Sequence, residues 1–135
     1  IGFTADGVVN RFSGNYVEDE NGNKTNNAIY VNNHGGDGSS ALNFEVKNGG
    51  YIVFDDEIDG GHYELDKNQL TGPVSDGYAY DINISGDATT QGLANSVVFN
   101  NKVKNVNDLV LDTAQMVLGK NAHIEIVKNK KSYKK

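Results

Sequence analysis

The chain has 135 residues with 18 acidic and 12 basic side chains, a formal net charge of −6, 16 glycines, one proline and no cysteine. This length fits one domain or a piece of a longer protein, and the absence of cysteine excludes disulfides and thiolate metal sites. All 18 acids and seven of the bases lie in residues 1–127, which therefore carry −11, and five lysines follow. Because an acidic body repels phosphates, we expect no nucleic-acid partner.

The hydropathy of the chain predicts no transmembrane helix. No stretch approaches the ~20 consecutive apolar residues that such a helix needs. We therefore expect a soluble segment, whose targeting signal has been removed or lies outside it.

Short β-prone runs alternate along the chain with corners rich in Asn, Asp and Gly. These corner residues tolerate the left-handed backbone of tight turns, and Asn48-Gly49-Gly50 is the clearest example. Runs of strong helix formers are absent, so an all-β chain is expected. The predicted strands, in chain order, are Ala28–Asn32, Ala41–Lys47, Tyr51–Phe54, His62–Leu65, Tyr78–Ser85, Ser96–Phe99, Asp108–Leu111, Gln115–Leu118 and Ala122–Lys128.

Several of these runs alternate with a period of two residues. Leu42, Phe44 and Val46 share one face of their run, and the polar residues between them share the other. Three longer polar stretches are predicted to protrude as loops from the regular body: Asn15–Asn27, Asn33–Ser40 and Asp87–Asn95.

One segment of the chain occurs twice, 45 residues apart. Tyr51–Gly60 returns as Ser96–Asn105, with apolar positions again apolar and two aspartates replaced by asparagines. After one-residue slips the match continues from Tyr63–Gly72 to Leu109–Gly119. Repeats of this length are typical of stacked structural units.

The repeat period can be divided into coils. A coil of three short strands and three bends needs roughly 20–25 residues, so two coils fit one period and about six fit the chain. The sequence therefore predicts a parallel β-helix (β-solenoid) of roughly six coils with protruding loops. Residues 1–40 would form an N-terminal cap or loop-bearing coils, residues 41–127 the repeat body, and residues 128–135 a basic tail or linker.

An apolar column inside the coils is the expected core. Repeat partners should lie above one another in this column. The residues predicted to be buried are Leu42, Phe44, Phe54, Leu65, Ile82, Ile84, Phe99, Val103 and Leu111.

The amino-acid sequences of three segments resemble those of a known family. Tyr51–Ile58, Tyr80–Asp87 and Ser96–Val106 are similar to the right-handed β-helical passengers of bacterial autotransporters, especially AIDA-type and related adhesin repeats. The likeness covers about residues 41–127. It implies a right-handed parallel β-helix in a surface-exposed or secreted segment, with adhesion, self-association or display of a virulence activity as its role.

The densest acidic cluster follows the first copy of the repeat. Asp55-Asp56-Glu57-Ile58-Asp59, with Asp66 or Asp76, could supply the oxygen ligands that Ca²⁺ prefers. The second copy carries amides and lysines at the same positions, which argues against a shared metal site and favours a solvent-facing bend. We assign no catalytic residue, metal or cofactor, and predict a binding surface of Asp55, Asp56, Asp59, Asn100, Asn101, Lys102 and Lys104.

The functional hypothesis is a non-catalytic adhesin or self-association segment at the bacterial cell surface or secreted. Its partners would be a second copy of itself, or a host-surface protein or glycan. Two alternatives stay open. One is a β-helical carbohydrate-active enzyme, for which Asp55, Asp59 and Asp66 are the dense carboxylate choice. The other is a β-sandwich module that binds a glycan or calcium.

Overall fold

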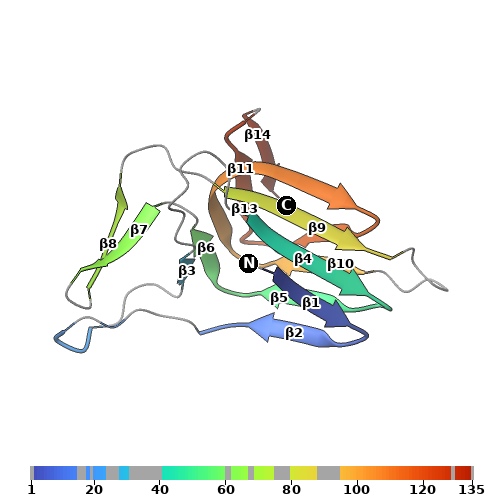
Figure 1. Cartoon of the computed structure of the whole chain (residues 1–135), viewed down its shortest axis with the longest axis horizontal. Helices are drawn as coiled ribbons and strands as arrows, with labels where there is room; N and C mark the ends of the chain where they lie inside the picture. Colours follow the sequence, from blue (N-terminus) through green and yellow to red (C-terminus); the bar gives the residue numbers. More distant parts are fainter. Residues whose placement is uncertain are drawn as a thin grey trace.

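The computed structural model describes residues 2–14, 18, 20–23, 28–30, 41–59, 62–66, 69–74, 80–87, 95–128 and 130–134. These residues form strands, bends and turns, with no helix among them, and so no helix long and apolar enough to cross a membrane. The strands are β1 (Gly2–Asp6), β2 (Val9–Phe12), β3 (Ala28–Tyr30), β4 (Ala41–Lys47), β5 (Tyr51–Phe54), β6 (Glu57–Asp59), β7 (His62–Asp66), β8 (Gln69–Val74), β9 (Tyr80–Gly86), β10 (Ser96–Phe99), β11 (Lys102–Asp112), β12 (Gln115–Leu118), β13 (His123–Ile126) and β14 (Lys131–Lys134) (Figure 1).

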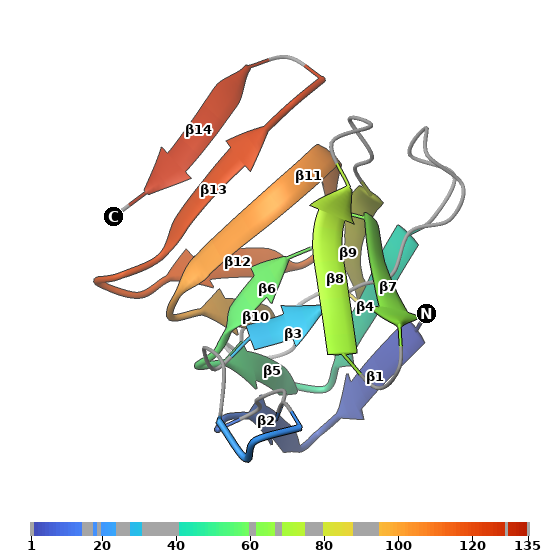
Figure 2. The same cartoon turned by 90° about the vertical axis from the view of Figure 1, so that its left-hand side faces the viewer.

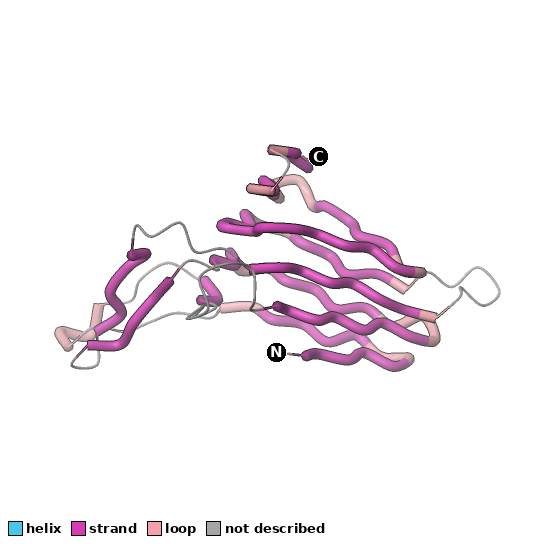
Figure 3. The backbone as a smooth tube through the Cα atoms, turned by 45° about the horizontal axis from the view of Figure 1, so that its top comes forward, coloured by secondary structure: helices cyan, strands magenta, loops and turns pink. Residues whose placement is uncertain are grey.

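Two main sheets organise the molecule. The larger has eight strands, in the order β1-β4-β9-β11-β13-β14, with β6 joined to β11 and β3 joined to β6. The smaller has the order β12-β10-β5-β2. The chain passes from the larger to the smaller sheet at four levels, from β1 to β2, β4 to β5, β9 to β10 and β11 to β12, so the strands stack level upon level (Figure 3).

The predicted right-handed parallel β-helix of roughly six coils is wrong. The sheets are mixed: β13 pairs with β14 in antiparallel orientation, and β7 pairs with β8 in antiparallel orientation as a separate two-stranded sheet (Figure 2). The architecture is two main sheets with parallel and antiparallel parts, with no uniform series of coils. The prediction failed because it extended one repeated segment to the whole chain.

The first parts of the two repeat copies pair directly with each other, although the predicted two coils per period would have placed them on alternate coils. Ser96 aligns with Tyr51 and Phe99 with Phe54 in the parallel ladder between β10 and β5. The alignment continues where β11 pairs with β6, since Val103 lies beside Ile58. The two copies are direct neighbours, so the 45-residue period spans one level of the stack and not two.

The core lies between the two main sheets and is built around stacked phenylalanines. The Phe12 and Phe54 ring centroids are 5.0 Å apart and those of Phe54 and Phe99 5.6 Å apart, in near-parallel planes. From the opposite sheet Phe44 contacts Phe54, with centroids 5.2 Å apart. Burying each such side chain stabilises the fold by about 1.5–3 kcal/mol, so this column is a main source of stability.

Most of the predicted core is confirmed. Leu42, Phe44, Phe54, Ile82, Ile84, Phe99 and Val103 are all buried. Leu111 is 46% exposed, so its predicted burial is wrong. Leu111 lies in the C-terminal half of β11, which pairs with β9 along one edge. No strand is described along the other edge of this half, which leaves Leu111 half exposed. The side chain of Leu65 lies outside the described part of the structure.

The corner between the main sheets depends on a turn that the sequence predicts. Asn48 and Gly49 both have positive φ, and the Gly50 amide donates to the Lys47 carbonyl at 2.8 Å. A side chain at Gly50 would collide with the Ala5 carbonyl of the neighbouring level. Glycine therefore permits the close approach of adjacent levels at this corner.

Side chains close the same corner between levels. Asn48 donates to the Asp6 carboxylate at 2.6 Å, and the buried Asn95 donates to Asp87 at 2.6 Å. The Oδ1 atom of Asn95 accepts from the Gly49 amide at 2.8 Å. The predicted loops Asn15–Asn27, Asn33–Ser40 and Asp87–Asn95 otherwise lie wholly or mostly outside the described residues.

Candidate functional site: a basic groove between β11 and β13

The acidic cluster of the first repeat copy bonds to neighbouring levels. Arg11 of β2 pairs with Asp55 at 2.7 Å and adds a second bond at 3.2 Å. Asn100 donates to Asp55 Oδ1 at 2.9 Å, the oxygen that also accepts the second bond from Arg11. The bond from Arg11, followed by that from Asn100, holds the pKa of Asp55 below its usual range. Arg11, Asp55 and Asn100 therefore form a ladder of side-chain hydrogen bonds across three levels.

Two other predicted surface carboxylates are buried. Asp56 is 4% exposed and accepts the Gly14 amide at 2.9 Å, and Asp59 is 6% exposed and accepts from the Asn105 side chain at 2.6 Å. Neither carboxylate can contact a partner at an outer face. Their place in the predicted binding surface is wrong because they satisfy polar groups inside the corner.

The amides of the second copy have local roles as well. The Oδ1 atom of Asn101 accepts the Lys102 amide at 2.8 Å, which begins β11. The side chain of Asn100 lies so close to Gly119 that a Cβ there would collide with it. Of the predicted surface, Lys102 and Lys104 are thus the side chains that remain directed outward.

The first residue of β9, Tyr80, is a buried phenol. Tyr80 is fully buried, and its hydroxyl has no hydrogen-bond partner among the described residues. Burial, and secondarily the nearby Asp59 carboxylate, raise the pKa of Tyr80. This hydroxyl carries a desolvation cost that the surrounding packing must offset.

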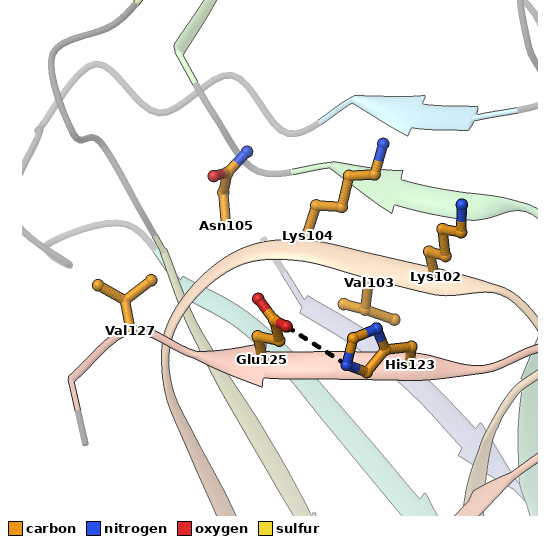
Figure 4. Close-up of a pocket in the computed structure, with 7 residues that line it drawn as sticks. All are labelled: Lys102, Val103, Lys104, Asn105, His123, Glu125 and Val127. Atoms are coloured by element: carbon orange, nitrogen blue, oxygen red, sulfur yellow. Dashed lines mark ion pairs between the residues drawn. The ribbon is translucent and has the colours of Figure 1, made fainter. Parts of the chain in front are cut away.

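Lys102 and Lys104 meet the next strand in a groove of about 450 Å³. Val103 between them points into the core, so the two-residue period of the strand places both lysines on the outer face. Figure 4 shows the two ammonium groups on the same side of β11. The groove is lined by Lys102, Val103, Lys104, Asn105, His123, Glu125 and Val127.

The opposite side of the groove comes from β13. The parallel register sets Lys102 beside His123, and Glu125 follows two residues later on the same face. The His123 and Glu125 side chains are 3.5 Å apart (Figure 4). The histidine can donate and accept hydrogen bonds at this edge, and the carboxylate can accept them.

The two lysines differ in their engagement. Lys104 is held by Glu57 of β6, with Nζ and Oε1 2.6 Å apart. Lys102 makes no ion pair within the described part of the chain. The groove thus presents Lys104 as a positioned cation and Lys102 as an available one. Two residues of a strand separate them, so their Cα atoms lie roughly 6–7 Å apart.

The sequence indicated only half of this groove. The two-residue alternation of Ala122–Lys128 predicts that His123 and Glu125 share a face. Nothing local shows that this face joins Lys102 and Lys104 from a strand 21 residues earlier, because such pairing is set by tertiary structure. The identity of the neighbouring strand is the missing information.

No group of three or more His, Cys, Asp or Glu side chains in the described ranges could hold a metal ion. No protein-family model matches the chain, and comparisons with curated proteins and with solved structures gave no match.

Proposed function

We propose that this chain is a non-catalytic binding segment of a bacterial surface or secreted adhesin, and that the groove between β11 and β13 holds its ligand. The observation that carries the proposal is the position of Lys102 and Lys104 on one outer face, beside His123 of the paired strand. Regular strands hold these groups at a fixed spacing, which lowers the entropic cost of binding.

The chemistry of the groove favours an acidic glycan. A lysine ammonium attracts carboxylate or sulfate groups, while Asn105, His123 and Glu125 can exchange hydrogen bonds with sugar hydroxyls. The net charge of −6 opposes densely charged polyanions. A glycan with sparse carboxylates satisfies both conditions, since the local cations bind it and the acidic body repels it little.

Isothermal titration calorimetry with a uronic-acid oligosaccharide tests the proposal. A hydrogen bond to a charged group contributes about 1.5–3 kcal/mol, so Lys102→Gln should weaken binding by about tenfold or more. Lys120→Gln is the matched control, because Lys120 is an exposed lysine of the turn before β13 and lies outside the groove.

Two results would contradict the proposal. Equal weakening by Lys120→Gln would show that the attraction is general and not located in the groove. If chromatography of the reaction mixture shows that the oligosaccharide has been cleaved, the carbohydrate-active enzyme is favoured instead.

A further inference from the structure

Both main sheets end on the same side of the molecule. β1 is the terminal strand of the larger sheet and pairs with β4, and β2 is the terminal strand of the smaller sheet and pairs with β5. No further strand pairing is described for either strand. Their outward backbone groups, apart from the Thr4 carbonyl that accepts from the Asn10 side chain, therefore offer a template for further strands.

The end of the core between these strands is apolar and incompletely covered. Phe3 and Phe12 meet edge to face with ring centroids 5.3 Å apart, and both are only partly buried. Val9 on β2 is 62% exposed. The phenylalanine column is closed by neighbours at Phe54, but among the described residues its Phe12 end is only partly covered.

Charge does not protect this end. Asp6 accepts from Asn48, and Arg11 pairs with Asp55, so both charged side chains of β1 and β2 are bound to the adjacent level. The opposite end of the larger sheet differs, since β14 carries Lys131 and Lys134. Lysines on an edge strand oppose further pairing.

We propose that the edge formed by β1 and β2 binds the same edge of a second copy of this chain. A twofold rotation about an axis perpendicular to the sheets places β1 antiparallel to its own copy and β2 antiparallel to its own copy. The two strands run in opposite directions in Figure 1, and the same rotation reverses both. Phe3 and Phe12 then meet their counterparts and close the core.

A second copy fits this edge better than a single foreign strand. Two partner strands are needed at the separation of β1 and β2, which is fixed in part by the bond from the Asn10 side chain to the Thr4 carbonyl, 3.0 Å long. A twofold-related copy supplies that separation automatically. One added strand would complete one sheet and leave the aromatic end exposed.

Sedimentation velocity of the 135-residue chain across a concentration series tests the inference. The unmodified chain should shift toward twice the mass of one chain as concentration rises. Val9→Lys places a lysine on the pairing strand of both copies and should abolish the shift. Val117→Lys, on the other terminal strand of the same sheet, is the matched control and should leave the shift unchanged.

Hydrogen exchange gives a readout that does not depend on either variant. The backbone amides of Thr4, Val9 and Arg11 should exchange more slowly at high than at low protein concentration. A chain that stays monomeric throughout the series would overturn the inference. So would dimers that Val117→Lys removes and Val9→Lys preserves, because the contact would then lie at the opposite edge.

Discussion

The two halves of the repeated segment behave differently. Tyr51–Asp59 and Ser96–Lys104 lie side by side in register, with their phenylalanines stacked in the core. Beyond them the copies separate: Tyr63–Gly72 contributes to the antiparallel pair β7 and β8, whereas Leu109–Gly119 supplies the end of β11 and β12 of the main sheets. Similar sequence patterns therefore serve two different pairings.

The difference lies in what each half can bury. The first half alternates apolar residues that face the opposite sheet, and Ile52, Phe54, Val97 and Phe99 are all buried there. In the second half of the later copy, Leu111 remains 46% exposed. A sequence repeat determines structure where its apolar positions find the same partners, and the match beyond that point is a likeness of strand pattern alone.

Truncation of the stacked phenylalanine should have the largest effect. Phe54→Ala removes contacts with Phe12, Phe44 and Phe99 and should lower the free energy of unfolding by about 3–5 kcal/mol. Leu111→Ala, in the second half, should cost about 1 kcal/mol or less because that side chain is half exposed. Urea denaturation of both variants measures the contrast, and equal costs would remove the distinction between the halves.

Substitution of Gly50, the residue before the first repeat copy, should lower the stability nearly as much. Gly50→Ala forces a Cβ against the Ala5 carbonyl and within 2.9 Å of the Lys47 oxygen, so we expect a loss of about 2–3 kcal/mol. Gly2→Ala is the control, because its nearest neighbour would be 3.9 Å away, and should change stability by less than ~0.5 kcal/mol. Thermal unfolding distinguishes them; a neutral Gly50→Ala would contradict the close approach of the levels.

The buried phenol should respond in the opposite direction. Tyr80→Phe removes a hydroxyl that has no hydrogen-bond partner among the described residues, and it should stabilise the chain by about 1 kcal/mol. The pKa of Tyr80 is raised in the folded chain, so ionisation of this phenol opposes folding. The folded chain therefore keeps its full stability below about pH 10, the pKa of tyrosine in the unfolded chain, and loses stability as the pH rises above it. Denaturation at neutral and alkaline pH should show a smaller alkaline loss for Tyr80→Phe than for the unmodified chain.

The ladder between levels should give the smallest effect. The pKa of Asp55 is lowered in the folded chain, so its stabilisation is present above the unfolded value near 3.9 and is lost as pH falls toward the folded value. Because Asp55 is partly exposed, Asp55→Asn should cost only about 0.5–1 kcal/mol at neutral pH. Denaturation curves of the two chains should converge in acid; a constant difference at all pH values would contradict this role.

The sequence predicted the local strands more accurately than it predicted how the strands pair. The β-prone runs located β4, β5, β10 and β12 with the bounds that the structure has, and the repeat placed Phe54 and Phe99 in the same core column. It did not identify the antiparallel hairpin of β7 and β8 or the pairing of β14, because alternation is the same for parallel and antiparallel strands.

The candidate site shows the same limit. Lys102 and Lys104 were expected at an outer face, but Asp56 and Asp59 were expected there too and are buried. Charge alone predicts exposure. Burial of these carboxylates depends on the Gly14 amide and the Asn105 side chain, which reach them from a distance of 42 and 46 residues in the sequence.

Disulfide trapping tests most directly the central claim that the first halves lie in register. The chain has no cysteine, so Val53→Cys with Val98→Cys creates a single possible pair on adjacent strands about 4.7–4.9 Å apart. Val53→Cys with Val117→Cys is the control, since β10 lies between those strands. The account predicts rapid oxidation of the first pair to an intramolecular disulfide and none of the second. Failure of the first pair to close in the folded chain, or equal closure of both, would contradict it.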